Sequence, residues 1–339
     1  MGWNICGHET AVAFLKEHTK PEKLRHAYLI TGPQGIGRRT LALAFVKALN
    51  CQNPPAPGEF CDACQACRQI NAQSFPDLAV LAPDEGHQDL RIDQIRAVQQ
   101  TLALAPYQAK YRVVLLLDFQ RATAAASNAL LKSLEEPPAR AVMVLTADAE
   151  ENLLPTIASR CQIIRLRPLP LEKASGWLEQ RLQVPADRAA LLAHLSSGRV
   201  GAAVRFDQNP ELLDAYQDAL DRLEELLGST RRQRLQYVES LQRSKGGQRE
   251  LVGQLISAWL TFWRDVLIAR SGAEMPLVNQ ERQAFLRKIA EQMDLARIEL
   301  ILEAHEKALT RLDAYVNPRL ILEHLLLRLP IFKSDRGAK

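Results

Sequence analysis

A glycine-rich turn near the N-terminus has the spacing of a phosphate-binding loop, but its charged residues differ from that pattern. Residues 27–41 read AYLITGPQGIGRRTL, a short apolar run, a turn and an amphipathic helix. The pattern requires lysine and then serine or threonine, because the ammonium binds the β- and γ-phosphates and the hydroxyl ligates Mg²⁺. A planar guanidinium replaces neither group. The residues of this degenerate loop are Gly32, Gly35, Gly37, Arg38, Arg39 and Thr40.

A second element of the nucleotide-binding type is also altered. Residues 112–117, RVVLLL, form a continuous apolar run that suits a buried parallel strand, and Asp118 ends it. In a hydrolysing ATPase of this type the next residue is usually glutamate, which polarises the attacking water. Phe119 stands there instead and cannot orient water. Asp118 is therefore either a degenerate metal-binding acid or a helix-capping or structural carboxylate.

Four of the six cysteines are grouped with the spacing of a metal site. Cys51 is followed by Cys61, Cys64 and Cys67, which supplies enough thiolates for a closed tetrahedral zinc site with a structural role. An iron–sulfur cluster is an alternative, since ferredoxins use a similar spacing. Disulfides fit poorly in a chain without a secretion signal. The single cysteines, Cys6 and Cys161, are expected to be small buried hydrophobic residues.

The composition bounds the class of protein. With 339 residues the chain is longer than one typical core, so we expect two or three domains. A net charge of +4 does not require a polyanionic partner. We expect neither a signal peptide nor a membrane-spanning helix, because a basic and then apolar N-terminal region is lacking and no apolar run approaches 18 residues. The expected location is the cytoplasm.

Apolar runs and helical spacing alternate along the first half of the chain, which predicts a parallel sheet with helices on both faces. The predicted strands after the first apolar run are 78–82, 112–117, 141–146 and 162–166. The predicted helices are 38–50, 92–104 and 123–135. A polar loop is expected at 83–90 and a frayed tail at 333–339.

No strand is predicted beyond Pro170, where successive amphipathic helices follow. We expect an α/β domain over 1–168, which contains the cysteine module at 51–67. A small helical domain over 169–207 and an all-α domain over 208–339 complete the predicted organisation.

Four motifs occur in an order that is typical of one family. They are LRHAYLITGPQGIG, the cysteine cluster, ALLKSLEEPP over 129–138 and the triplet Ser159-Arg160-Cys161. This order resembles bacterial clamp-loader proteins of the AAA+ class, in particular the delta-prime family of DNA polymerase III. The resemblance covers the sheet domain and is loosest in the C-terminal helices. It implies a P-loop-type AAA+ domain with a zinc insertion, a helical lid and a C-terminal helical collar for oligomerisation.

The resemblance also assigns roles to single residues. ATP lies at subunit boundaries in clamp loaders, and the arginine of the Ser-Arg-Cys triplet reaches into the neighbour's site. Arg160 is thereby implied to be an arginine finger in trans, and the alternative is a surface arginine beside an acidic neighbour. Thr146 matches a sensor of the γ-phosphate, and the alternative is a strand-end hydroxyl that satisfies the backbone.

A later sensor arginine of the motor subunits is replaced by Gly201 in the alignment that the resemblance gives. Arg199 lies two residues earlier and would point elsewhere on a helix. Together with Arg38, Arg39 and Phe119, this makes four separate losses from the ATPase machinery. They indicate a subunit that does not hydrolyse ATP.

The resemblance therefore implies a non-hydrolysing clamp-loader subunit, without ATPase activity of its own, that helps to load the sliding clamp onto primed DNA as a component of the DNA polymerase III holoenzyme. The implied partners are the tau/gamma ATPase subunits and the delta subunit, with the clamp and primed DNA contacted through the complex, and no membrane. ATP is expected in the neighbouring subunit. Two alternatives are an ATP-hydrolysing tau/gamma-type motor, which Phe119 and Gly201 disfavour, and a zinc-dependent nucleic-acid-binding module.

Overall fold

A computed structural model of the chain describes residues 2–3, 5–83, 89–241, 248–275, 277–313 and 316–332. The predicted tail and most of the predicted polar loop at 83–90 lie outside the described residues. The chain separates into two compact units, Met1–Arg205 and Phe206–Lys339. The division into three domains remains a prediction.

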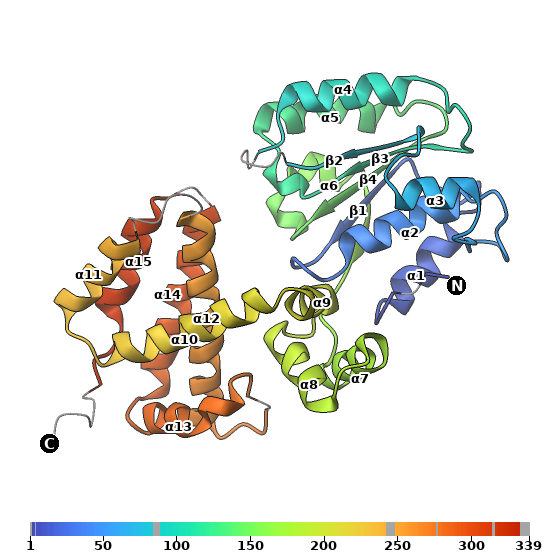
Figure 1. Cartoon of the computed structure of the whole chain (residues 1–339). Coiled ribbons are helices and arrows are strands. Elements are labelled where there is room, and N and C mark those ends of the chain that lie inside the picture. Colours follow the sequence, from blue (N-terminus) through green and yellow to red (C-terminus); the bar gives the residue numbers. More distant parts are fainter. Residues whose placement is uncertain are drawn as a thin grey trace, which may run out of the picture. The chain divides into compact units, whose positions relative to one another are not determined.

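The first unit contains a five-stranded parallel sheet in the order β2-β3-β4-β1-β5 (Figure 1). Its strands are β1 (Ala27–Thr31), β2 (Leu78–Leu81), β3 (Arg112–Leu116), β4 (Ala141–Ala147) and β5 (Gln162–Arg165). The four strands predicted by range are confirmed, each within one residue at its end. Parallel strands share one carboxyl edge, so the glycine-rich loop after β1 and Asp118 after β3 meet at the same edge of the sheet.

Both faces of the sheet are covered by helices, because alternate strand residues point to opposite sides. Tyr28 and Ile30 pack in one buried cluster, whereas Leu29 packs in another. The first cluster includes residues of α1 (Glu9–Glu17), α2 (Arg38–Asn50) and α3 (Gln65–Asn71). The second includes residues of α4 (Ile92–Ala103), α5 (Ala124–Glu135) and α6 (Pro155–Ala158). The predicted α/β class is confirmed.

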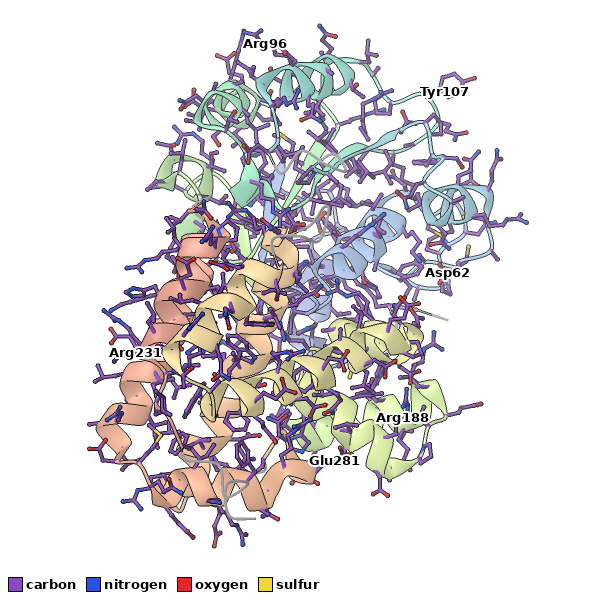
Figure 2. The ribbon with its side chains drawn as sticks, turned by 60° about the vertical axis from the view of Figure 1, so that its left-hand side comes forward. Asp62, Arg96, Tyr107, Arg188, Arg231 and Glu281 are labelled. Carbon is purple, nitrogen blue, oxygen red and sulfur yellow. The ribbon has the colours of Figure 1, made fainter. Side chains whose placement is uncertain are left out.

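A buried carboxylate fixes the loop between α4 and β3. Asp77 accepts hydrogen bonds from the backbone N–H groups of Tyr107, Gln108 and Ala109 at 2.8–2.9 Å, and from Arg112 Nη2 at 2.8 Å. Burial would raise the pKa of Asp77, but these donors lower it. The loop is thus held firmly while the Tyr107 side chain, 83% exposed, points outward (Figure 2).

Three helices follow the sheet: α7 (Leu171–Leu182), α8 (Ala186–Leu195) and α9 (Val200–Gln208). Single-turn 3₁₀ helices occur at Phe119–Arg121, Glu150–Asn152 and Gln280–Arg282. Among the described residues beyond Pro170 there is no strand, as predicted.

The second unit is all-helical. Its helices are α10 (Pro210–Leu227), α11 (Arg231–Leu241), α12 (Gln248–Ser271), α13 (Gln283–Glu291), α14 (Leu295–Asp313) and α15 (Pro318–Arg328). The core centres on the fully buried rings of Trp259, Phe262 and Trp263 on α12. Arg234 is also fully buried, and it donates to carbonyl oxygens of residues 226, 326, 329 and 330 at 2.6–2.9 Å. This cation therefore caps the carboxyl ends of α10 and α15, where it meets the negative ends of the helix dipoles.

Part of α12, over 251–271, is long and apolar enough to cross a membrane by length and composition alone. Of the 18-residue window that meets this test, 56% is buried inside the protein. Asp265 lies on this helix, fully buried, and accepts hydrogen bonds from Val278 N–H and from Asn279. A central core helix satisfies the same test, and these contacts are those of a core helix.

Candidate functional site

The glycine-rich loop needs glycine at more than one position. Gly37 is the N-cap of α2 with φ 110°, a backbone conformation that side chains with a Cβ disfavour. Gly35 has φ 81°, and a Cβ built there would lie 2.7 Å from the Cβ of Ala202. The sequence therefore folds into the predicted strand–loop–helix unit, with its N–H groups at the start of a 13-residue helix.

Arg38 is paired within the chain. Its Nη2 lies 2.7 Å from Oδ1 of Asp118, and the Arg38 side chain is only 8% exposed. Burial lowers the pKa of Arg38, and the negative charge of Asp118 opposes that shift. Arg38 Nη1 is buried without a hydrogen-bond partner among the described residues. The pair joins the first residue of α2 to the end of β3, so each of the two altered nucleotide elements neutralises the other. Arg39 and Thr40 are exposed on the same turn.

Thr146, the sensor candidate, makes a local contact. Its Oγ1 accepts a hydrogen bond from the Asp118 N–H at 2.9 Å, and the residue is 2% exposed. Asp118 has φ 50°, an unusual value for a residue with a Cβ. The hydroxyl thus satisfies a strained strand end, which is the alternative that the sequence left open. Phe119, next in the chain, is 1% exposed and packs in the core beneath α4 and α5.

The carbonyl groups of the loop are engaged by segments that sequence reasoning did not associate with it. Ala202 N–H donates to Gly35 O at 3.0 Å, and His8 Nε2 lies 3.3 Å from Ile36 O. Gly201 has no room for a side chain, because a Cβ there would lie 2.7 Å from Gly35 O. The residue at the predicted sensor position therefore lies against the glycine-rich loop with its backbone, where a side chain would not fit.

The sequence predicted that Arg199 lies on a helix and points elsewhere, and this prediction is wrong. Arg199 precedes α9, so the helical geometry assumed for it does not apply. Its Nη1 donates to Gln34 O at 3.2 Å and its Nε to Ser196 O at 2.7 Å. Arg199 thus points to the loop, and its donors contact protein carbonyl groups.

The four grouped cysteines converge. Their sulfur atoms all lie within 4.8 Å of one another. Cys51 follows α2 directly, and Cys64 is the N-cap of α3. Backbone N–H groups of Cys61, Cys64 and Cys67 point at the sulfur atoms of Cys51, Cys61 and Cys64, respectively, at 3.2–3.4 Å. Such donors stabilise thiolates, and four thiolates at this separation fit a tetrahedral metal ion.

The surroundings of the cluster are also ordered by specific contacts. The Lys47 ammonium lies 2.6 Å from Oδ1 of Asp62, a residue on the cysteine loop that is labelled in Figure 2. The same ammonium is 4.2 Å from the ring centroid of Phe60. Trp3 Nε1 donates to Gly58 O at 3.0 Å. The module is therefore attached to both α2 and the N-terminal segment.

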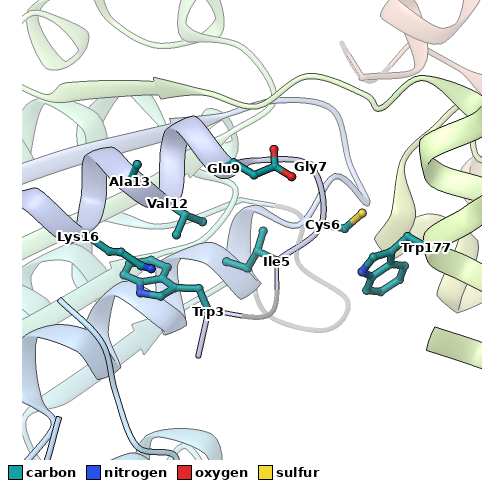
Figure 3. A pocket seen from close by; sticks show the side chains of 9 residues that line it. All are labelled: Trp3, Ile5, Cys6, Gly7, Glu9, Val12, Ala13, Lys16 and Trp177. Carbon is teal, nitrogen blue, oxygen red and sulfur yellow. The ribbon is translucent and has the colours of Figure 1, made fainter. Parts of the chain in front are cut away.

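A cavity of about 430 Å³ lies beside that segment (Figure 3). Figure 3 shows the indoles of Trp3 and Trp177 at its two sides and Cys6 between them. Burial and then the charge of Glu9 raise the pKa of Cys6 to about 11, so its thiol is protonated at neutral pH. The lining includes no residue of the glycine-rich loop. Sequence reasoning missed this hollow, because residues far apart in the chain form it.

Arg160 stands at the end of α6, where the chain turns into β5. Its Nη1 donates to Thr156 O at 2.9 Å and its Nη2 to Glu135 Oε1 at 2.8 Å. The Arg160 side chain is 36% exposed and that of Glu135 is 52% exposed. The next residue, Cys161, has its pKa raised to about 12 by burial. Within the triplet, the arginine is partly exposed to solvent, and the cysteine is half-buried and packs against the core.

The first unit thus combines a parallel sheet with a P-loop-type turn, a four-cysteine insertion and a partly exposed arginine after a short helix. Comparisons with known proteins identify the family of the chain. A family model described as "DNA polymerase III, delta subunit" matches residues 7–170, and one described as "DNA polymerase III, delta subunit, C terminal" matches residues 210–330. The chain belongs to this DNA polymerase III delta-subunit family.

Individual relatives are named delta' or tau. The delta' subunit of Pseudomonas aeruginosa is 41% identical over 175 residues, which are 51% of this chain and 53% of that protein. The delta' subunit of Bacillus subtilis is 28% identical over 308 residues, 91% of this chain and 92% of that protein. The tau subunit of Bacillus subtilis is 25% identical over 353 residues, 96% of this chain and 61% of that protein. The chain thus spans about half the length of the Pseudomonas relative and most of the Bacillus delta' subunit.

Proposed function

We propose that this chain is a non-hydrolysing, delta-prime-type subunit of a bacterial replicative clamp loader, which helps to load the sliding clamp onto primed DNA. The ion pair at 2.7 Å between the buried Arg38 and the partly exposed Asp118 carries this proposal. In a working site, a lysine would bind phosphates and the acid would bind Mg²⁺. Here the two charges satisfy each other, so a nucleotide and its metal would have to break the pair first.

Other contacts support the loss of hydrolysis. Phe119 is a core residue, and Gly201 contributes a backbone contact to the loop. Neither can orient water or stabilise charge on a phosphoryl group.

The exposed Arg160 supports a role in trans. A guanidinium placed at a neighbour's phosphoryl group stabilises the charge of the transition state, and such arginines raise rates by about 10³–10⁵. On this proposal Arg160 serves the ATP site of an adjacent tau/gamma-type subunit. The delta subunit would be another partner, and the clamp and primed DNA would be reached through the assembly in the cytoplasm.

The second unit is the proposed collar. Exposed large apolar side chains occur on α14 and α15, among them Leu300 at 65%, Leu320 at 59% and Leu327 at 41%. Packing of such side chains against other subunits would remove them from water.

A zinc ion held by Cys51, Cys61, Cys64 and Cys67 would serve the structure of the first unit, since four protein ligands leave no open position for a substrate.

The test of the proposal is ATP hydrolysis and nucleotide affinity of the isolated chain, with the Asp118→Asn variant as control. We expect turnover at background level for both proteins, and a single Arg38→Lys change should not restore it, because Phe119 and Gly201 remain. Turnover by the wild type that Asp118→Asn abolishes would establish an ATPase motor and refute the proposal.

A further inference from the structure

We propose that Glu135 is a positioning residue, which holds the Arg160 guanidinium at the surface of this subunit in reach of a neighbour's phosphoryl group. The inference rests on the proposed role of Arg160 in trans and adds a second side chain to it. Glu135 would touch neither ATP nor the reacting atoms, and would act through Arg160 alone.

The guanidinium is held at two points. Nη1 donates to Thr156 O at 2.9 Å and Nη2 to Glu135 Oε1 at 2.8 Å, so a backbone group and a side chain fix its plane together. An arginine has five N–H groups. Among the contacts of the described residues these two use one each, so the remaining N–H groups are available to phosphoryl oxygens.

Both holding points stand on rigid elements. Leu134, beside Glu135 at the end of α5, is 2% exposed, and Ile157 on α6 is fully buried. These two side chains belong to the same buried cluster. The distance between Glu135 and Arg160 is therefore set by the core of the sheet unit, which favours a precise position over a chance encounter of flexible chains.

The position of Glu135 in its helix favours a cation beside its carboxylate. It is the last residue of α5, where the helix dipole disfavours a carboxylate. Glu136, the next residue, is equally acidic and exposed, but it pairs with no cation among the residues that the structure describes. The two adjacent acids thus form a natural test pair, of which only one contacts Arg160.

The exposure of the pair permits the proposed function. Since both side chains are in contact with water, the ion pair contributes little to stability and can rearrange when a phosphoryl group approaches. A fully buried pair would hold the arginine in place but withhold it from a neighbour.

The experiment uses clamp-loader assemblies rebuilt with tau/gamma and delta subunits. In the tau/gamma subunits whose ATP sites do not face this chain, the phosphate-binding lysine is replaced, so that only the site facing this chain hydrolyses ATP. We expect Glu135→Ala to lower kcat for DNA- and clamp-stimulated hydrolysis by about two- to fivefold, the range in which exposed ion pairs contribute. KM for ATP should stay unchanged. Glu135→Gln, which keeps an acceptor oxygen, should lose less, and Glu136→Ala should match the wild type.

The double variant identifies the path of the effect. In an Arg160→Ala background, Glu135→Ala should cause no further loss. In the isolated chain, NMR of arginine side chains should show a more mobile Arg160 Nε–H group in Glu135→Ala than in Glu136→Ala. An undiminished loss in the double variant, or a wild-type kcat for Glu135→Ala while Arg160→Ala is slow, would overturn the inference alone. A wild-type rate for Arg160→Ala would instead refute the arginine-finger proposal on which it rests.

Discussion

Two arginines of the first unit make nearly the same ion pair in opposite surroundings. Arg38 lies 2.7 Å from Asp118 and Arg160 lies 2.8 Å from Glu135. The first arginine is 8% exposed and the second 36%. Because the guanidinium of Arg38 is shielded from water and that of Arg160 is not, Arg38 is committed to its own chain, whereas Arg160 can exchange partners. Burial of the guanidinium, and not the identity of the paired groups, separates Arg38 at the glycine-rich loop from Arg160.

The largest expected effect concerns Arg160. Arg160→Ala should slow hydrolysis at the neighbouring ATP site on the order of 10³-fold, and Arg160→Lys should slow it as well, because an ammonium lacks the planar fork. Assembly and the fold should not change. The measurement is hydrolysis and clamp loading by rebuilt assemblies, and loss of assembly in place of rate would make Arg160 a structural residue and erase the contrast with Arg38.

Arg234 extends the comparison to a buried cation that has no acidic partner among the residues that the structure describes. Arg234→Met removes four hydrogen bonds to carbonyl groups at the ends of α10 and α15, so we expect a loss of about 3–4 kcal/mol in the free energy of unfolding. Arg232→Met, on the exposed side of the same helix, is the control. Urea unfolding compares them, and equal stabilities would mean that the carbonyl groups find other donors.

The free energy of unfolding should depend on pH through His305, a buried histidine that stays neutral in the folded chain. His305 donates through Nδ1 to Ile301 O, and burial lowers its pKa from 6.5 to about 4. The unfolded chain binds a proton below pH 6.5 and the folded chain only near pH 4, so this residue's contribution to stability falls as the pH decreases through that window. We expect a loss of about 2 kcal/mol at pH 5 relative to pH 7.

His305→Gln should remove this part of the pH dependence. Urea titrations of both proteins at pH 5 and 7 measure the difference, in which the contributions of the other titratable groups cancel. An unchanged dependence in the variant would mean that His305 is protonated in the fold.

The smallest effect is expected for Arg38. Arg38→Met removes a buried charge whose Nη1 is unpaired among the described residues, and Asp118, 36% exposed, remains hydrated. The expected loss is about 1 kcal/mol, with Arg39→Met as the exposed control. Thermal unfolding of the three proteins gives the comparison. A loss above about 3 kcal/mol would show that Asp118 depends on Arg38 for its solvation.

The sequence by itself determined the sheet unit, the cysteine cluster and the motif that contains Arg160. These features are local: strands follow from runs of buried residues, glycine spacing fixes a turn, and four thiols at short separations converge because few residues lie between them. The replacement of ATPase residues by Arg38, Arg39 and Phe119 could also be predicted from the sequence, because these are changes of residue type at fixed places in a motif.

Only the tertiary structure decided which groups satisfy one another. Arg38 and Asp118 are 80 residues apart, and Arg199 reaches Gln34 across 165 residues. Glu135 meets Arg160 because α5 and α6 pack on one core. No local pattern encodes such distances, since they depend on where the sheet places the ends of its strands and on which side chains remain in contact with water. The residue types predicted the possible chemistry, and their burial determines which arginine is free to take part in it.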